Sequence, residues 1–182
     1  MGFASGLPTQ HANSFGPWEN CDYLNGMPYL CCLPGLLCGL AACVTDMRRR
    51  LVPRRLIIAG VTAQLAACMF LASSTGKFVV LLHAITGLVC ATGIQFALAL
   101  IRPGALGLGD VTACALIGCM LGVFGTAAFI SWWLFMGFLG LVWIDAWRRY
   151  AKRHPDADAR VPFVPVIVAS GLLAVATSVI GR

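Results

Sequence analysis

The sequence has few charged residues and very few acidic ones. Only 11% of its 182 residues are charged and seven are Asp or Glu, whereas 59% are hydrophobic. A soluble domain of this length does not need so much apolar surface, which excludes a soluble globular protein. Apolar runs of about 18–20 residues are typical of membrane helices, so the composition predicts an integral membrane protein.

The sequence also lacks any Cys-x-x-Cys pair, which argues against a structural zinc site. Most of its nine cysteines lie within apolar runs, where they are expected to act as small packing residues. Cys21, Cys31 and Cys32 lie near the start of the first apolar run and could form one disulfide. The sequence leaves that pairing open.

Residues 1–27 lack the basic start, apolar middle and small-residue cleavage site of a signal peptide. They are rich in Gly, Pro and Asn and are predicted to form a loose extracytoplasmic tail. Residues 28–182 contain no repeat and no separate polar domain, so we expect a single transmembrane domain.

Six apolar stretches predict an all-α fold with about six transmembrane helices and both termini outside. A very short join after the fourth stretch predicts a tight hairpin, and Gly118, Gly122 and Gly125 are expected to loosen the end of that helix. The predicted spans are Pro28–Thr45, Leu56–Ala72, Phe78–Ile101, Val111–Ala127, Phe129–Trp147 and Pro162–Ile180.

Basic residues set the predicted orientation. Of the 13 Lys and Arg residues, five follow the first span, one follows the third and five follow the fifth, all on one side. Only Lys77 and Arg182 fall on the other side. Because basic loops stay in the cytoplasm, the side that carries most of them is predicted to be cytoplasmic. The net charge of +6 then reports topology, and no nucleic-acid partner is expected.

Two aspartates are the main candidates for chemistry. Asp110 ends a glycine-rich segment, residues 103–110, and an aspartate at the edge of a span is a functional candidate. The glycines in this segment are expected to adopt backbone conformations that a side chain would forbid. Asp46 ends the first span on the same side, so both carboxylates should lie at similar depth. Paired carboxylates are what aspartyl proteolysis requires. An interfacial ion pair between Asp46 and Arg48–Arg50 is the alternative.

The other polar residues favour structural roles. Asp145 lies three and four residues before Arg148 and Arg149, a helical spacing that predicts a surface ion pair. Gln64 and Gln95 lie within predicted spans and could bridge helices by hydrogen bonds. Cys114 follows Asp110 by one turn, but the one histidine that could share its depth, His154, is predicted to lie in a loop, which argues against a cysteine nucleophile.

Three segments resemble the type IV prepilin leader peptidases, which are GxGD-type aspartyl peptidases of the membrane. Asp46-Met47-Arg48-Arg49-Arg50-Leu51-Val52-Pro53 resembles their D-x-R-x-R-x-I-P-N segment. Gly107-Leu108-Gly109-Asp110-Val111 is similar to the GxGD motif, and Pro162-Phe163-Val164-Pro165 to a late P-F-G-P segment. The three occur in the family's order, which makes the resemblance specific.

The resemblance implies a multi-pass peptidase of the bacterial cytoplasmic membrane. Such an enzyme removes the short basic leader of a prepilin or pseudopilin on the cytoplasmic side, just before the substrate's apolar helix, and needs no metal or other cofactor. Asp46 and Asp110 would be its catalytic pair. Residues that would position the substrate or the backbone are Gly107, Gly109, Arg50, Pro53, Pro162, Phe163 and Pro165.

Helix ends and prolines indicate how such a site would work. Asp46 meets the negative end of its helix dipole and Asp110 a positive end, which favours Asp110 as the base and Asp46 as the acid, although Arg48–Arg50 oppose this. Pro162 and Pro165 are expected to kink the entry of the last span and to leave nearby carbonyls free.

The sequence also departs from the family pattern. Arg54 replaces an Asn, Val52 an Ile, Thr112 a frequent Lys, and Val164 the Gly of P-F-G-P. The chain lacks the cytoplasmic insertion of the long, methylating members, so it resembles the short, peptidase-only branch. A small membrane transporter and a non-catalytic membrane subunit of a pilus or secretion assembly are the alternatives.

Overall fold

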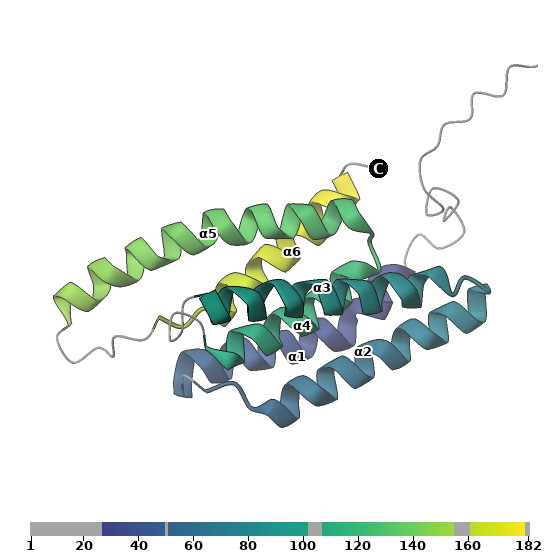
Figure 1. Ribbon diagram of the computed structural model, residues 1–182, viewed down its shortest axis with the longest axis horizontal. Coiled ribbons are helices and arrows are strands. Elements are labelled where there is room, and N and C mark those ends of the chain that lie inside the picture. The colour runs from purple at the N-terminus through teal and green to yellow at the C-terminus, as the bar shows by residue number, and fades with distance from the viewer. Residues whose placement is uncertain (1–26, 50, 102–106, 155–160, 181–182) are drawn as a thin grey trace, which may run out of the picture.

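The computed structural model describes residues 27–49, 51–101, 107–154 and 161–180, and within these ranges the secondary structure is six helices with no strand (Figure 1). The all-α prediction is confirmed. Four helices, α1, α2, α3 and α5, are long and apolar enough to cross a membrane, whereas α4 and α6 are shorter apolar helices. The bounds are α1 Met27–Arg49, α2 Arg54–Thr75, α3 Val79–Ile101, α4 Leu108–Gly122, α5 Thr126–Arg153 and α6 Val164–Ile180.

The predicted tight hairpin is confirmed between α4 and α5. Helix α4 ends at Gly122, five residues before the predicted end of the fourth span, and α5 begins at Thr126. Gly125 has φ +88°, in the left-handed region that glycine adopts without strain, so the chain reverses there. Helix α5 then continues to Arg153 and extends beyond the other helices (Figure 1).

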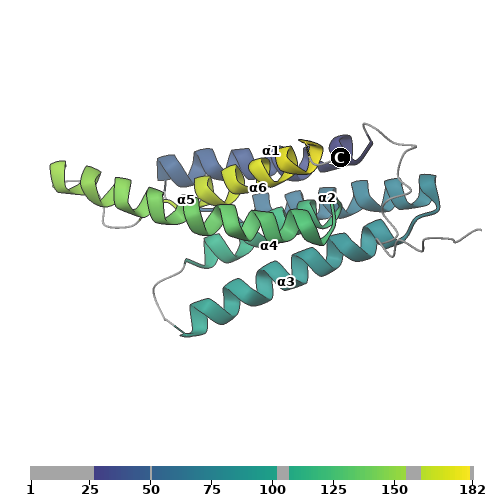
Figure 2. The ribbon, with the colours of Figure 1, turned by 90° about the horizontal axis from the view of Figure 1, so that it is seen from above.

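Helix α4 is the most buried element. Ten of its 15 residues are buried, and it packs against α1, α2, α3, α5 and α6 (Figure 2). A Cβ on Gly118 would lie 2.5 Å from Cβ of Ala91, and a Cβ on Gly122 would lie 2.2 Å from the His83 carbonyl oxygen. These glycines do not loosen the helix as predicted from the sequence. They let the backbones of α3 and α4 approach closely, as small residues do between membrane helices.

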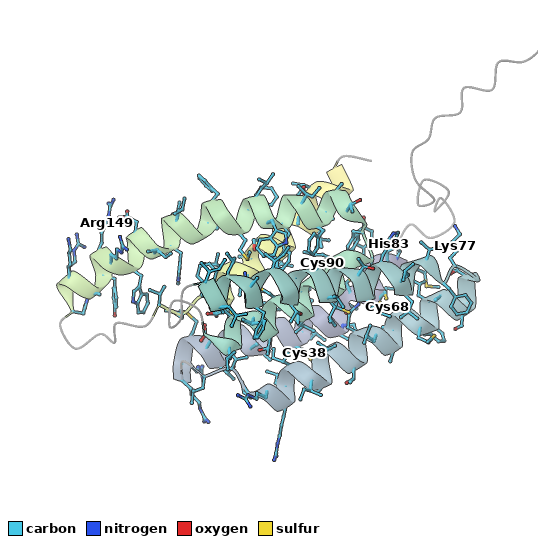
Figure 3. All side chains as sticks on the ribbon, in the orientation of Figure 1. Cys38, Cys68, Lys77, His83, Cys90 and Arg149 are labelled. Atoms are coloured by element: carbon cyan, nitrogen blue, oxygen red, sulfur yellow. The ribbon has the colours of Figure 1, made fainter. Side chains whose placement is uncertain are left out.

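The helices alternate in direction, so α1, α3 and α5 end where α2, α4 and α6 begin (Figure 1). We call this the aspartate end, because Asp46 and Asp110 lie there. Arg149 lies toward the same end on α5, whereas Lys77 lies at the opposite end (Figure 3). The predicted ion pair is confirmed, with Arg149 Nη2 2.6 Å from Asp145 Oδ2. The start of α1 and the end of α6 share the opposite end.

Candidate active site

Asp46 lies in the last turn of α1 and is 7% exposed. Its Oδ2 accepts a hydrogen bond of 3.2 Å from the backbone N–H of Val164, the first residue of α6. The first N–H groups of a helix have no partner within the helix and form its positive end. The end of α1 and the beginning of α6 are therefore joined through this carboxylate.

The segment before α6 is fixed by α5. Trp143 Nε1 donates a hydrogen bond of 2.8 Å to the carbonyl of Pro162, and the ring of Phe163 covers Gly140, where a Cβ would lie 3.1 Å from its Cζ. The prediction of free carbonyls is wrong for Pro162, because Trp143 occupies that oxygen. Pro165 is the second residue of α6, where a missing N–H breaks no helical bond.

Asp110 lies in the first turn of α4 and is partly buried. Its Oδ2 accepts a hydrogen bond of 3.3 Å from the backbone N–H of Gly107, and its own N–H donates one of 3.0 Å to the Gly107 carbonyl. This reciprocal pair fixes the carboxylate at the start of the helix. The neighbouring Thr112 donates its hydroxyl to the Gly109 carbonyl at 2.9 Å.

The glycines of this segment act differently from the prediction. Gly107 has φ −77° and ψ 142°, an extended conformation open to any residue, and among the described glycines only Gly76 and Gly125 have positive φ. Gly109 instead permits a close approach, because a Cβ there would lie 3.0 Å from Cγ2 of Val52. Gly104 lies outside the described residues.

The two aspartates lie at one end of the bundle, on helices α1 and α4, which pack against each other. Val52, in the loop between α1 and α2, lies against Gly109, the residue before Asp110. Two carboxylates that share a site do not both ionise cheaply, so such a pair tends to share a proton. Asp46 and Asp110 are therefore the candidates for an acid–base pair.

Pro53 and Arg50 are the remaining residues that the sequence predicts to position the substrate or the backbone. Pro53 is exposed, and its carbonyl accepts the N–H groups of Leu56 and Ile57, so it sets the start of α2. Arg50 lies outside the described residues. No group of three His, Cys, Asp or Glu side chains in the described ranges is arranged to hold a metal ion.

Sequence reasoning missed three contributors to the site: Val164, Trp143 and Gly140. The Val164 contribution is a backbone N–H, which leaves no side-chain signal. Gly140 and Trp143 are spaced three residues apart and so share one helix face, and that spacing was the only available hint.

A model of the type IV leader peptidase family matches residues 33–144, more than half of the chain and including both aspartates. The chain belongs to this family. Membership of the leader peptidases implies aspartic-type peptidase activity in general and association with a membrane, in agreement with the four long apolar helices. The match ends before the Pro162–Pro165 segment, which reaches the site through Asp46. No curated protein and no solved structure matches the chain significantly.

Proposed function

We propose that this protein is a prepilin or pseudopilin leader peptidase of the bacterial plasma membrane. It hydrolyses the peptide bond between a short basic leader and the substrate's apolar N-terminal helix, and Asp46 and Asp110 are its catalytic residues. The observation that supports this proposal is that both aspartates lie at the same end of the bundle, on the packed helices α1 and α4.

The chemistry needs one ionised and one protonated carboxyl. The ionised aspartate takes a proton from water, which attacks the scissile carbonyl carbon, while the protonated aspartate donates to the carbonyl oxygen. When the tetrahedral intermediate collapses, a proton passes to the leaving amine. The hydrogen bonds from Val164 to Asp46 and from Gly107 to Asp110 orient the two carboxylates before substrate arrives.

The acid and the base are not assigned by helix dipoles. Asp46 is near the negative end of α1, but the positive end of α6 also faces it through the Val164 N–H. Asp110 lies at the positive end of α4. Asp46 therefore adjoins a positive helix end as well as a negative one, which weakens the asymmetry expected from the sequence.

The orientation of the site follows from basic residues. Among the described residues, eight Lys and Arg residues lie at or beyond the aspartate end, and Lys77 lies at the other. Basic residues that flank membrane helices favour the cytoplasmic side, so the site faces the cytoplasm and the bilayer surrounds the apolar helix faces. The eight are Arg48, Arg49, Arg54, Arg55, Arg148, Arg149, Lys152 and Arg153.

The structure favours a peptidase over a transporter. Among the described residues Asp46 is the only buried charged side chain, and α4 presents an apolar interior to its neighbours. A path for ions across the bilayer would need polar groups along its depth. A non-catalytic subunit differs from a peptidase in tolerating the loss of both aspartates.

Co-expression with a candidate prepilin tests the proposal, with leader removal followed as a shift on a gel. Asp46→Asn and Asp110→Asn should each reduce cleavage at least about 100-fold, because each removes one partner of acid–base catalysis. Asp145→Asn is the matched control, since Asp145 is exposed and paired with Arg149. Wild-type rates from either aspartate variant, at equal abundance in membranes, would refute the proposed mechanism.

A further inference from the structure

Two buried cysteines face each other at the end opposite Asp46. Sγ of Cys31 on α1 lies 3.7 Å from Sγ of Cys68 on α2, and the residues are 7% and 0% exposed. Cys31 precedes Asp46 by fifteen positions, about 22 Å along a helix at 1.5 Å per residue. Figure 3 shows Cys68 on the same half of the bundle as Lys77. The cysteine pair is therefore separate from the aspartate site.

Pro34 interrupts the backbone hydrogen bonding of α1 next to Cys31. Pro34 lies inside α1 and has no N–H to bond to the preceding turn. The next N–H, that of Gly35, donates to Oε1 of Gln64 at 3.0 Å, while Nε2 of Gln64 donates to the Cys31 carbonyl at 3.1 Å. In a regular helix the Gly35 N–H would pair with that same carbonyl, so the Gln64 amide bridges the two groups. The prediction that Gln64 bridges helices is confirmed.

The same amide also holds Cys68. Gln64 Nε2 lies 3.5 Å from Cys68 Sγ, one helical turn further along α2. One fully buried side chain thus contacts both the backbone of Cys31 and the sulfur of Cys68. A Cβ on Gly35 would lie 2.6 Å from Gln64 Oε1, so the contact also requires glycine at this position.

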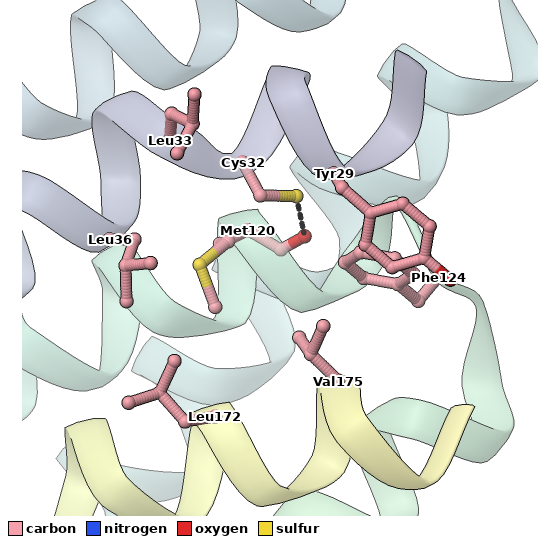
Figure 4. A pocket seen from close by; sticks show the side chains of 8 residues that line it. All are labelled: Tyr29, Cys32, Leu33, Leu36, Met120, Phe124, Leu172 and Val175. Carbon is pink, nitrogen blue, oxygen red and sulfur yellow. Dashed lines mark hydrogen bonds between the residues drawn. The ribbon is translucent and has the colours of Figure 1, made fainter. Parts of the chain in front are cut away.

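Cys32, the neighbour of Cys31, points elsewhere. Its Sγ lies 3.7 Å from the Met120 carbonyl and lines an apolar pocket of about 200 Å³ between α1, α4 and α6 (Figure 4). Cys119 of α4 packs in the same cluster as Cys31 and Cys68. The sequence left Cys21, Cys31 and Cys32 open as a disulfide set; the structure directs Cys31 to Cys68, and Cys21 lies outside the described residues.

We infer that Cys31 and Cys68 are a disulfide-forming pair that ties α1 to α2 at the end of the bundle opposite Asp46. Bond formation requires the sulfurs to close from 3.7 Å to about 2.05 Å, a change of about 1.7 Å. The reaction partner of the two thiols is a disulfide oxidant. With the proposed orientation the pair lies toward the outer side of the membrane, where the environment is oxidising. That the oxidant comes from this side is the only part of the inference that rests on the proposed function.

The reaction is a thiol–disulfide exchange in two steps. The Cys31 thiolate, the more exposed of the two, attacks the oxidant's disulfide, and the first oxidant thiolate leaves. The Cys68 thiolate then attacks the Cys31 sulfur, which forms the protein disulfide and releases the second oxidant thiolate. Two protein thiols are oxidised, one oxidant disulfide is reduced to two thiols, and the two thiol protons pass to its sulfurs.

The experiment uses the full chain in native membranes treated with oxidised glutathione. Free thiols are blocked with N-ethylmaleimide, disulfides are then reduced, and newly exposed thiols are labelled with polyethylene-glycol maleimide in denaturant. The wild type should gain two labels and yield a linked Cys31–Cys68 peptide in mass spectrometry. Cys31→Ser and Cys68→Ser should each abolish both signals, whereas Cys32→Ser and the exposed Cys90→Ser should retain them.

Two results would overturn the inference. One is full blocking of all nine cysteines before reduction, even after oxidation. The other is a linked peptide that contains Cys119 or Cys21 and persists in Cys31→Ser. The double variant Cys31→Ala/Cys68→Ala should cleave prepilin at the wild-type rate under reducing conditions. Loss of cleavage in the aspartate variants and loss of the disulfide signal are therefore independent outcomes.

Discussion

The backbone N–H of Val164 donates to the carboxylate of Asp46 across 118 positions of sequence. The bond joins the last turn of α1 to the first residue of α6, and Trp143 holds the Pro162 carbonyl two residues earlier. The late proline segment therefore positions the proposed catalytic carboxylate through its backbone, although it lies beyond the part of the chain that matches the family.

Val164→Pro should reduce leader cleavage by about tenfold or more, because proline removes the N–H that orients Asp46. Proline is tolerated at the first position of a helix, so α6 should still form. Val164→Ala keeps the N–H and is the matched control. Initial rates of leader removal, normalised to membrane abundance, make the comparison. Equal rates in the proline and alanine variants would show that the hydrogen bond has no catalytic role.

Gly109→Ala should impair cleavage, since the new Cβ would lie 3.0 Å from Val52 Cγ2 and displace the start of α4. Shortening the opposing side chain removes the contact with Cγ2 but keeps Val52 Cβ at 3.2 Å, so Gly109→Ala/Val52→Ala is expected to recover part of the lost rate. Gly107→Ala should be milder, because its Cβ would meet Asp110 Oδ2 at an ordinary 3.4 Å. The gel-shift assay measures all three. A double variant no better than Gly109→Ala would mean that the glycine serves another purpose, such as contact with substrate.

Trp143→Phe should slow cleavage several-fold while the protein remains folded. The variant keeps most of the ring but loses the N–H that donates to Pro162, so the segment before α6 loses one of its fixed contacts. Trp143→Leu, which also removes the ring, should be worse. Cleavage rates together with thermal denaturation in detergent distinguish a positioning effect from loss of fold. A rate unchanged in Trp143→Phe would contradict the positioning role.

Gln64→Leu should lower the free energy of unfolding by about 2 kcal/mol, because it leaves the Gly35 N–H and the Cys31 carbonyl without their amide partner. Gln95→Leu is the control, because the Gln95 side chain is also buried. Its Oε1 accepts no hydrogen bond from the described residues, so replacing it should cost much less. Reversible unfolding in mixed detergent measures both. A Gln95 variant as unstable as the Gln64 variant would contradict the bridging role.

The sequence was sufficient to predict the helices and to bring Asp46 and Asp110 to one end. Apolar runs define the predicted spans, and the basic loops indicate which helix ends share one side. Because α2 and α3 run in opposite directions between α1 and α4, α4 begins at the end where α1 finishes. The sequence was insufficient where backbone groups act. The Val164 N–H and the Pro162 carbonyl carry no residue-specific signal, and the pairing of α6 with α1 depends on three-dimensional packing.

The glycines illustrate a second limit. From the sequence, Gly109, Gly118 and Gly122 suggested unusual dihedral angles or a loose helix. In the structure each is small because another chain segment lies against it: Val52 for Gly109, Ala91 for Gly118 and the His83 carbonyl for Gly122. A missing side chain is compatible with either cause, and only the neighbours distinguish them.

The contact between α3 and α4 has a mechanical consequence. With backbone against backbone at Gly87, Gly118 and Gly122, neither helix has room to slide or rotate past the other. We therefore expect α3 and α4 to move as one rigid unit that keeps Asp110 stationary. Spin labels on these two helices should keep a constant separation when a prepilin peptide binds, and a changed separation would contradict this. Any adjustment that admits a leader peptide must then come from α1 and α6, which bring Asp46 to a fixed counterpart.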